Sequence, residues 1–145
     1  MKISTKGRYA LRMLLDLAAH EDEGFVALKE IAERQNISKQ YLEQIVAILN
    51  TSKILRSNRG KKGGYMLAQK PSQYTVGQIL RLTEGSLAPV ACLDDEANHC
   101  DRAEHCPTLP MWAGLHNVIT DYLESITLQD MMAQYQAQGT DSYVI

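Results

Sequence analysis

Three cysteines lie close together in the second half of this 145-residue sequence, at Cys92, Cys100 and Cys106. Seven residues separate the first pair and five separate the second, so no C-x-x-C pair is present. This spacing argues against a structural zinc ribbon. Three thiolates on one loop could instead bind an iron–sulfur cluster, which normally takes four protein ligands.

The fourth ligand of such a cluster must be another side chain. Histidines and acidic residues of the same stretch are local candidates: His99, His105, Asp94, Asp95, Glu96, Asp101 and Glu104. His116 follows on the next predicted helix. Two other interpretations stay open. Two of the cysteines could pair on oxidation and act as a redox switch, or all three could be ordinary thiols.

Charge is divided unevenly between the two halves of the chain. Residues 1–70 hold 13 Lys and Arg against 7 Asp and Glu, a net charge of +6, whereas residues 71–145 hold 2 against 10, a net charge of −8. Five basic residues fall within ten positions with no acid among them: Lys53, Arg56, Arg59, Lys61 and Lys62. A polyanion such as DNA would therefore bind the first half and be repelled by the second.

The first half has the pattern of a helix-turn-helix followed by a basic hairpin. The expected elements are a helix capped by Thr5 and ending near His20, helices Leu28 to Gln35 and Ser38 to Asn50, and strands Ile54 to Ser57 and Tyr65 to Leu67. The turn between the strands, residues 58–64, is rich in glycine and lysine. Together these elements predict a winged helix, in which the second helix of the pair enters the major groove and the hairpin reaches phosphates or the minor groove.

The sequence of the second half predicts one helix before the cysteines and two helices after them. Thr75 is expected to cap a helix through Glu84. Residues 85–108 show no periodicity and form a sensor loop longer than the ~15 residues beyond which loops are usually functional or disordered. A long amphipathic helix then follows from Leu109 to Ser125, and Thr127 with Asp130 suggests a capping box for a short last helix that ends near Gln134.

We therefore expect a mainly α fold with a small β-wing, that is, a winged helix-turn-helix plus a long C-terminal dimerisation helix. The expected divisions are a DNA-binding domain at 1–84, the cysteine loop at 85–108, the dimerisation helix with the short last helix at 109–135, and a flexible tail at 136–145. The apolar stripe of the long helix comprises Leu115, Val118, Ile119, Tyr122 and Leu123. It could be covered by a second copy, giving a homodimer and a near-palindromic DNA site, or by its own chain.

Several function classes lack support in the sequence. No nucleophile elbow, P-loop, H-E-x-x-H motif or paired-carboxylate arrangement is present, so an enzyme is not expected. No run approaches the ~18 apolar residues of a membrane span. The first residues lack the apolar stretch of a signal peptide, which predicts a cytoplasmic protein whose cysteines are reduced.

Four segments resemble one family of bacterial regulators. They are Lys6-Gly7-Arg8-Tyr9-Ala10, Tyr41-Leu42-Glu43-Gln44-Ile45, Arg59-Gly60-x-x-Gly63-Gly64-Tyr65 and Ile126-Thr127-Leu128. Between Met1 and about residue 132 the chain is similar to the winged-helix regulators IscR, CymR and NsrR. The resemblance implies a homodimeric repressor or activator of transcription. The cysteine loop looks most like IscR, the regulator of iron–sulfur cluster assembly genes.

The resemblance also assigns roles to individual residues. Cys92, Cys100 and Cys106 match the cysteine ligands of the IscR branch, which carries a 2Fe–2S cluster on three cysteines and a histidine. The matching histidine position here is Leu109, so the fourth ligand is unassigned. Ser38, Gln40, Tyr41, Glu43 and Gln44 match the recognition helix, and Arg59 matches the minor-groove contact of the wing. The basic residues Lys2, Lys39, Lys61 and Lys62 complete the expected DNA-binding set.

An alternative function comes from the other branches and from the end of the chain. An aspartate near the N-terminus marks the NsrR branch, and Arg8 stands here instead. CymR, a repressor of cysteine metabolism, lacks the three-cysteine loop. The terminal Tyr143-Val144-Ile145 resembles the tail with which some serine acetyltransferases dock into cysteine synthase. A CymR-like repressor controlled by thiol oxidation, or by cysteine synthase bound to this tail, is therefore the alternative.

Overall fold

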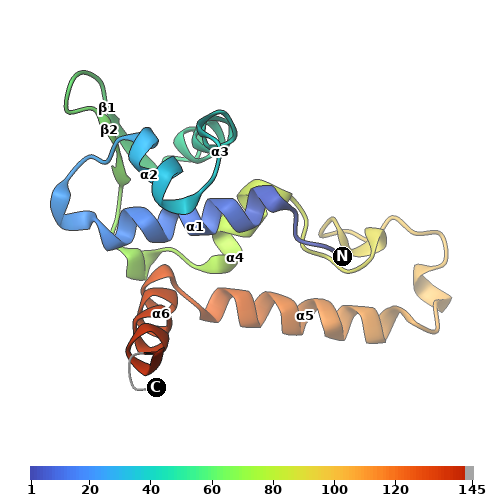
Figure 1. Cartoon of the computed structure of the whole chain (residues 1–145). Coiled ribbons are helices and arrows are strands. Elements are labelled where there is room, and N and C mark those ends of the chain that lie inside the picture. Colours follow the sequence, from blue (N-terminus) through green and yellow to red (C-terminus); the bar gives the residue numbers. More distant parts are fainter. Residues whose placement is uncertain (143–145) are drawn as a thin grey trace.

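The computed structural model describes the backbone of residues 1–142 and the side chains of residues 1–139. Its helices and strands are α1 (Thr5–Ala19), α2 (Leu28–Gln35), α3 (Lys39–Thr51), β1 (Leu55–Asn58), β2 (Gly64–Leu67), α4 (Val76–Glu84), α5 (Leu109–Ser125) and α6 (Leu128–Ser142). The mainly α fold with a small β-wing is confirmed. Figure 1 shows α1 to α4 and the wing gathered on one side, with α5 extending away below them. None of the described helices is both long and apolar enough to cross a membrane.

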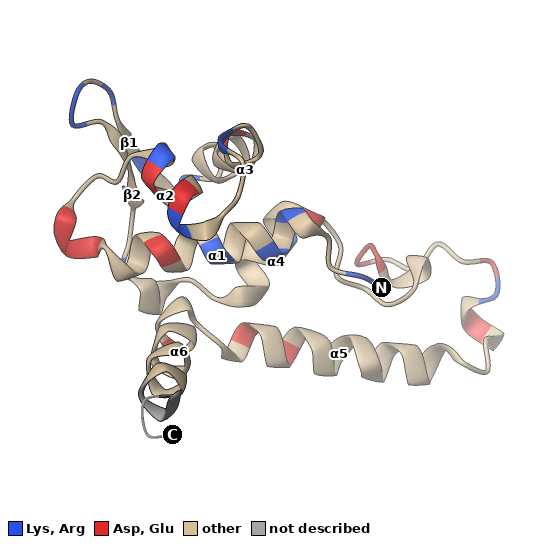
Figure 2. Ribbon diagram, in the orientation of Figure 1, with Lys and Arg blue, Asp and Glu red and all other residues tan. Residues whose placement is uncertain are grey.

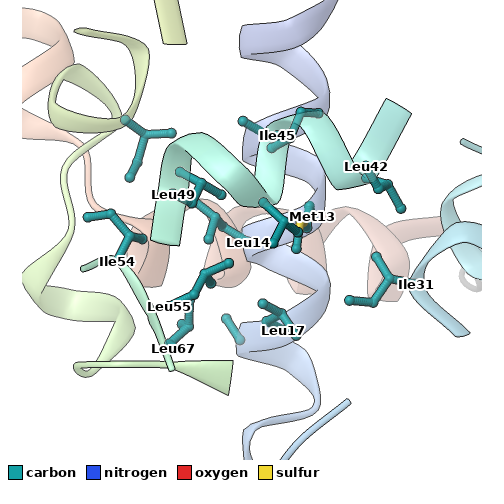
Figure 3. Close-up of a cluster of buried hydrophobic side chains, with 14 of the residues drawn as sticks. Met13, Leu14, Leu17, Ile31, Leu42, Ile45, Leu49, Ile54, Leu55 and Leu67 are labelled. Atoms are coloured by element: carbon teal, nitrogen blue, oxygen red, sulfur yellow. The ribbon is translucent and has the colours of Figure 1, made fainter. Parts of the chain in front are cut away.

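The core lies where α1 runs beneath α3 and the two strands. Apolar side chains recur on the inner faces of these elements, and Met13, Leu14, Ile45 and Leu49 have no exposed surface. Figure 3 shows them interleaved with Leu55 and the other labelled side chains between the helices and the strands. Burial of a leucine-sized side chain is worth about 1.5–3 kcal/mol, so this cluster is the main source of stability for the module formed by residues 1–84.

The wing is anchored at its base by a third strand-like segment. β1 and β2 pair antiparallel, from Leu55 opposite Leu67 to Asn58 opposite Gly64. Val26 adds a bridge on the other side of β2, where its N–H donates to the carbonyl of Tyr65 and its carbonyl accepts from the Tyr65 N–H, both at 2.8 Å. Gly64 has a φ of 156°, and a Cβ there would lie 2.2 Å from the Val26 carbonyl oxygen. Glycine at this position therefore allows the close approach that fixes the hairpin.

Helix α5 is tied to the rest of the chain at its C-terminal end. The N–H of Val76 donates to the carbonyl of Ile126 at 2.8 Å, and the N–H of Leu128 donates to the carbonyl of Tyr74 at 3.0 Å. Glu124 accepts a hydrogen bond from the Thr75 hydroxyl at 2.9 Å and forms an ion pair with Arg81. The start of α4 therefore holds the end of α5, while the rest of α5 projects outward (Figure 1).

The apolar stripe of α5 is covered by its own chain only near its C-terminal end, where Leu123 packs against the cluster of Val76, Leu80 and Leu87. No residue of this helix is buried. Val118 and Tyr122 are 65% and 63% exposed, and Met111 is 54% exposed. The interpretation that this stripe packs only within its own chain does not agree with these exposures. Contiguous exposed apolar surface of this kind marks an interaction face.

Two predicted helix boundaries are wrong, the end of α6 and the start of α1. Helix α6 does not end near Gln134 but continues to Ser142, so residues 136–142 of the expected tail are helical. The predicted Thr127–Asp130 capping box does form, with the Thr127 N–H donating to the Asp130 carboxylate at 2.9 Å and the Asp130 N–H to the Thr127 hydroxyl at 3.1 Å. Beyond Gln134 the sequence has no apolar stripe, but Gln136, Ala137 and Gln138 are good helix formers that continue a capped helix.

The start of α1 also differs from the prediction. Ser4, not Thr5, occupies the N-cap position, and its hydroxyl makes no capping bond within the helix. The carboxylate of Glu84, at the end of α4, instead accepts from the Ser4 N–H at 3.0 Å, the Ser4 hydroxyl at 2.6 Å and the Gly7 N–H at 3.1 Å. A negative charge at a helix N-terminus is favourable, so Glu84 caps α1 from a distant part of the sequence.

The module contains one buried charged residue, Asp16 of α1. Arg34 of α2 donates to both of its carboxylate oxygens, at 2.7 and 3.0 Å, and Gln35 donates at 2.9 Å. Burial alone would raise the pKa of Asp16, but the hydrogen bonds from Arg34 and Gln35 and the charges of Arg34 and His20 outweigh it, so the pKa lies below its ordinary value. The pair joins the end of α2 to α1.

We predict that Arg34→Met lowers the free energy of unfolding by about 3 kcal/mol at pH 7, because the buried Asp16 carboxylate loses its partner. The pKa of Asp16 is lowered in the folded wild type, so the pair's stabilisation is present above the ordinary value of 3.8 and is lost as pH falls through the folded pKa. Urea unfolding at pH 7 and at about pH 2.5, below the ordinary pKa, should show a smaller difference between variant and wild type at the lower pH. A double variant, Arg34→Met with Asp16→Asn, tests the coupling. If its loss in free energy of unfolding equals the sum of the losses in the two single variants, the two side chains are not coupled.

Candidate nucleic-acid interface and cysteine loop

The turn between α2 and α3 has the geometry that a helix-turn-helix requires. Asn36 ends α2 in the left-handed conformation, at φ 53° and ψ 48°, as its sequence position predicts. Ile37 is then buried, and the Ser38 hydroxyl accepts from the Tyr41 N–H at 3.1 Å, which caps α3. These contacts set the direction in which α3 leaves the turn.

The outer face of α3 carries the side chains predicted to contact DNA. Lys39, Gln40, Glu43 and Gln44 are exposed, whereas Leu42, Ile45, Val46 and Leu49 on the opposite face are buried. Tyr41 is half-buried, because its ring packs edge-on against Tyr9 of α1 at a centroid distance of 5.6 Å. The helix therefore presents hydrogen-bonding groups to solvent on a rigid support.

The tip of the wing carries an exposed cationic group. Arg59, Lys61 and Lys62 are all exposed, and Gly60 has a positive φ of 110° that lets the turn close. Figure 2 shows basic residues at the hairpin tip and on α2 and α3, on the same side of the molecule. The N-terminus lies at the other end of α1 from the wing (Figure 1). Lys2, next to it in the sequence, is exposed. The tip and α3 form a surface suited to a polyanion.

The cysteine loop connects α4 to α5 and is not a regular element. It contains two single 3₁₀ turns, Ala91–Leu93 and Ala103–His105. Cys92 is half-buried and Cys100 is exposed, and both line a hollow of about 290 Å³ together with Asp95 and His99. Cys106 does not line this hollow. Within the described part of the chain, no three His, Cys, Asp or Glu side chains lie close enough together to hold a metal ion.

Cys106 lies two residues before the N-cap of α5, and the pKa of its thiol is lowered. The Thr108 side chain lies 3.5 Å from the Cys106 sulfur. Hydrogen bonds from the Thr108 hydroxyl and from the backbone of Thr108 and Leu109 lower the pKa of Cys106, and the charge of Arg102 adds to this effect. A lower pKa favours the thiolate, which is the form that binds metals and reacts with oxidants.

The candidate fourth ligands are distributed along the loop. His99 shares the hollow with two cysteines and lies 3.9 Å from Asp95. His105 is exposed, and the Nδ1 of the half-buried His116 is enclosed without a hydrogen bond within the described residues. The remaining carboxylates, on Asp94, Glu96, Asp101 and Glu104, are exposed. The donor types fit an iron–sulfur cluster, but the loop as described brings together only two of the three cysteines, so its conformation must change for all three to share a site.

Sequence reasoning missed the residue that links the loop to the N-terminal module. Glu84 directly precedes the loop and caps α1 through Ser4 and Gly7. A Cβ on Gly7 would lie 2.4 Å from the Glu84 carboxylate, which explains the glycine at that position. The contact joins residues 77 to 80 positions apart, and no local pattern signals it. A movement of the loop would therefore act on the start of α1 through Glu84.

Comparison with known proteins gives a consistent result. A model of the Rrf2 family, described as iron-dependent transcriptional regulators, matches residues 3–134. The transcriptional regulator CymR of Bacillus subtilis is 38% identical over 144 residues, which is 99% of this chain and 98% of that protein. The solved structure of CymR, the global cysteine regulator of B. subtilis, matches with a TM-score of 0.76 at 36% identity, covering 92% of this chain and 98% of that one. The solved structure of T. potens IscR also matches with a TM-score of 0.76, at 40% identity, and the match covers 95% of this chain and 91% of that one.

Proposed function

This chain belongs to the Rrf2 family of DNA-binding transcriptional regulators, and we propose that it acts as a homodimer that senses iron–sulfur cluster status or redox state and controls cluster-assembly genes. The observation that carries this proposal is the position of the three cysteines. All of them lie in the one loop between α4 and α5, which connects the DNA-binding module to the exposed helix. A change in this loop can therefore act on both parts.

On DNA, α3 would enter the major groove. Gln40, Glu43 and Gln44 on its exposed face can hydrogen-bond base edges, and Glu43 can accept from cytosine N4 or reject other bases. Arg59 would enter the minor groove from the wing, while Lys61 and Lys62 contact phosphates. A two-fold dimer presents two copies of this surface and therefore fits a near-palindromic operator.

In the cysteine loop, Cys92, Cys100 and Cys106 would hold the cluster, and His99 is the histidine already beside two of them. When bound, an iron–sulfur cluster supplies a one-electron redox centre. The chain's own residues transmit its presence: Glu84 at one end of the loop caps α1, and α5 at the other end carries the dimer face. A coupling of about 1–3 kcal/mol would change operator affinity about 5–150-fold.

The test is an ultraviolet–visible spectrum with iron and sulfide assays of protein purified without oxygen. We expect visible charge-transfer bands that are absent from the Cys92→Ala, Cys100→Ala, Cys106→Ala triple variant, and their shape would report whether the cluster is 2Fe–2S. A His99→Ala variant asks whether this histidine is the fourth ligand. A colourless, iron-free wild type that resists reconstitution would contradict cluster sensing.

A CymR-like function is the second candidate, because CymR of B. subtilis is as similar to this chain as IscR is. Cysteine synthase would then bind the tail that ends in Tyr143, Val144 and Ile145, which lie outside the described residues. A free terminal carboxylate on such a tail suits capture by a partner. Titration of cysteine synthase with the full chain and with a chain ending at Ser142 tests this directly. Equal binding of both chains, or binding of neither, rejects a role for the tail.

A further inference from the structure

A groove of about 450 Å³ lies where α1, the end of α2 and α6 meet. It is separate from the α3 surface, the wing and the cysteine loop, none of which lines it. Figure 1 shows α6 descending on the opposite side of α1 from α3. Its volume falls within the ~300–1,000 Å³ range of small-molecule sites, towards the lower end.

Part of the lining of the groove is cationic. Arg12, Arg34 and His20 line it, with Asp16 as the only acidic residue among the lining side chains. The Asp16 carboxylate is already bonded by Arg34 and Gln35, so it neutralises one guanidinium and leaves an excess of positive charge. This excess lies in a chain whose overall charge is −2.

Arg12 is held in place without being neutralised. Its guanidinium lies 5.2 Å from the centroid of the Tyr9 ring and donates to the side chain and the backbone carbonyl of Gln35. None of the hydrogen bonds among the described residues uses the Nη1 of Arg12 or of Arg34. Two pre-placed guanidinium groups therefore keep a donor each for an anion.

The rest of the lining is mostly apolar. Leu15 and Ala19 of α1 line it, and Met131, Met132 and Tyr135 of α6 lie opposite. Tyr135 is 76% exposed. Methionine side chains are flexible and polarizable and can adjust to differently shaped apolar groups. A lining that combines apolar side chains with cationic groups is complementary to a molecule that has an apolar body and an anionic group.

We propose that this groove is a binding site for a small amphipathic carboxylate. The carboxylate lies between Arg12 and Arg34, because a planar guanidinium fork matches the two carboxylate oxygens. The apolar body lies against Leu15 and Met132. The ligand contacts the last turn of α2, just before Asn36 and the turn into α3, so it is placed to report a metabolite to the DNA-binding module independently of the cysteines.

The first experiment is calorimetric titration of the full-length protein with 3-phenylpropionate and, as the uncharged match, 3-phenylpropanamide. We expect saturable binding of the carboxylate with a Kd below about 1 mM, which is reasonable for a ligand of this size. The amide should bind about tenfold more weakly, since it loses the charge-assisted hydrogen bonds. No saturation by either probe, or equal affinities for the two, overturns the proposal.

Two variants locate the site. Ala19→Leu fills part of the groove from an exposed position in α1, and Arg12→Gln removes the charge that is not shared with Asp16. Each should weaken 3-phenylpropionate binding about tenfold or more, and only Arg12→Gln should abolish the preference for the carboxylate over the amide. The matched controls, Ala133→Leu on α6 and Arg8→Gln on α1, lie outside the groove and should bind as the wild type does. Wild-type affinity in both groove variants would show that the probe binds elsewhere.

Discussion

Val118→Asp should convert the protein from a dimer to a monomer and weaken operator binding by a factor of about 10²–10⁴. Val118 is 65% exposed on α5, between Leu115 and Tyr122 on the same apolar stripe. A carboxylate at the centre of an apolar interface cannot be solvated or paired, so it disfavours association. A monomer has one recognition surface, and loss of the linked second binding event accounts for the size of the effect. Sedimentation equilibrium measures the oligomeric state, and a gel shift measures the operator affinity.

The control for this change is Asn117→Asp, which adds the same charge to the adjacent exposed position of α5. It should leave the oligomeric state unchanged if the apolar stripe is the interface. The Val118 variant should also keep the wild-type circular dichroism spectrum, because no residue of α5 belongs to the buried core. A Val118→Asp protein that remains dimeric would place the dimer contact on another face.

Local signals made the N-terminal module predictable. Ser38, Thr75 and Asn36 each act within a few residues of their own position, as N-caps or as a left-handed helix end. The apolar positions of α3 are buried as their spacing requires, with Leu42, Ile45 and Leu49 fully enclosed. The strands were placed to within one residue, because the glycine-rich turn limits where they can pair. Short-range chemistry therefore determines most of this part of the fold.

The remaining features depend on contacts between distant residues. The capping of α1 by Glu84 joins positions about 80 apart and leaves no periodic pattern. Beyond Gln134 the apolar stripe that guided the prediction is missing, and α6 continues through the good helix formers Gln136, Ala137 and Gln138 as far as Ser142. The relative positions of Cys92, Cys100 and Cys106 depend on an irregular loop, for which sequence spacing alone gives no geometry.

A second prediction concerns the wing, and its expected effect on operator binding is similar in size to that of Val118→Asp. Replacing Arg59, Lys61 and Lys62 with alanine should weaken operator binding about 10²–10³-fold and reduce the salt dependence of binding. Each phosphate contact contributes about 0.9 to the slope of log affinity against log salt, and Lys61 and Lys62 on the two wings of a dimer make four such contacts, so the slope should become smaller by about three to four. Gel shifts at salt concentrations from 50 to 300 mM measure both quantities.

Single substitutions separate charge from position. Arg59→Ala alone should reduce the affinity for the operator more than the affinity for random DNA, because the negative potential of a narrow minor groove depends on sequence. Arg102→Ala removes the same charge from the cysteine loop in the acidic half of the chain. Measured in cluster-free protein, so that its effect on Cys106 does not enter, it should change neither affinity nor slope. If Arg102→Ala lowers the slope as much as Arg59→Ala does, net charge and not the wing controls DNA binding.

The wing is held by the Val26–Tyr65 bridge at its base and not by its tip. The alanine variants should therefore keep wild-type stability, and any loss of affinity then belongs to the contact with DNA.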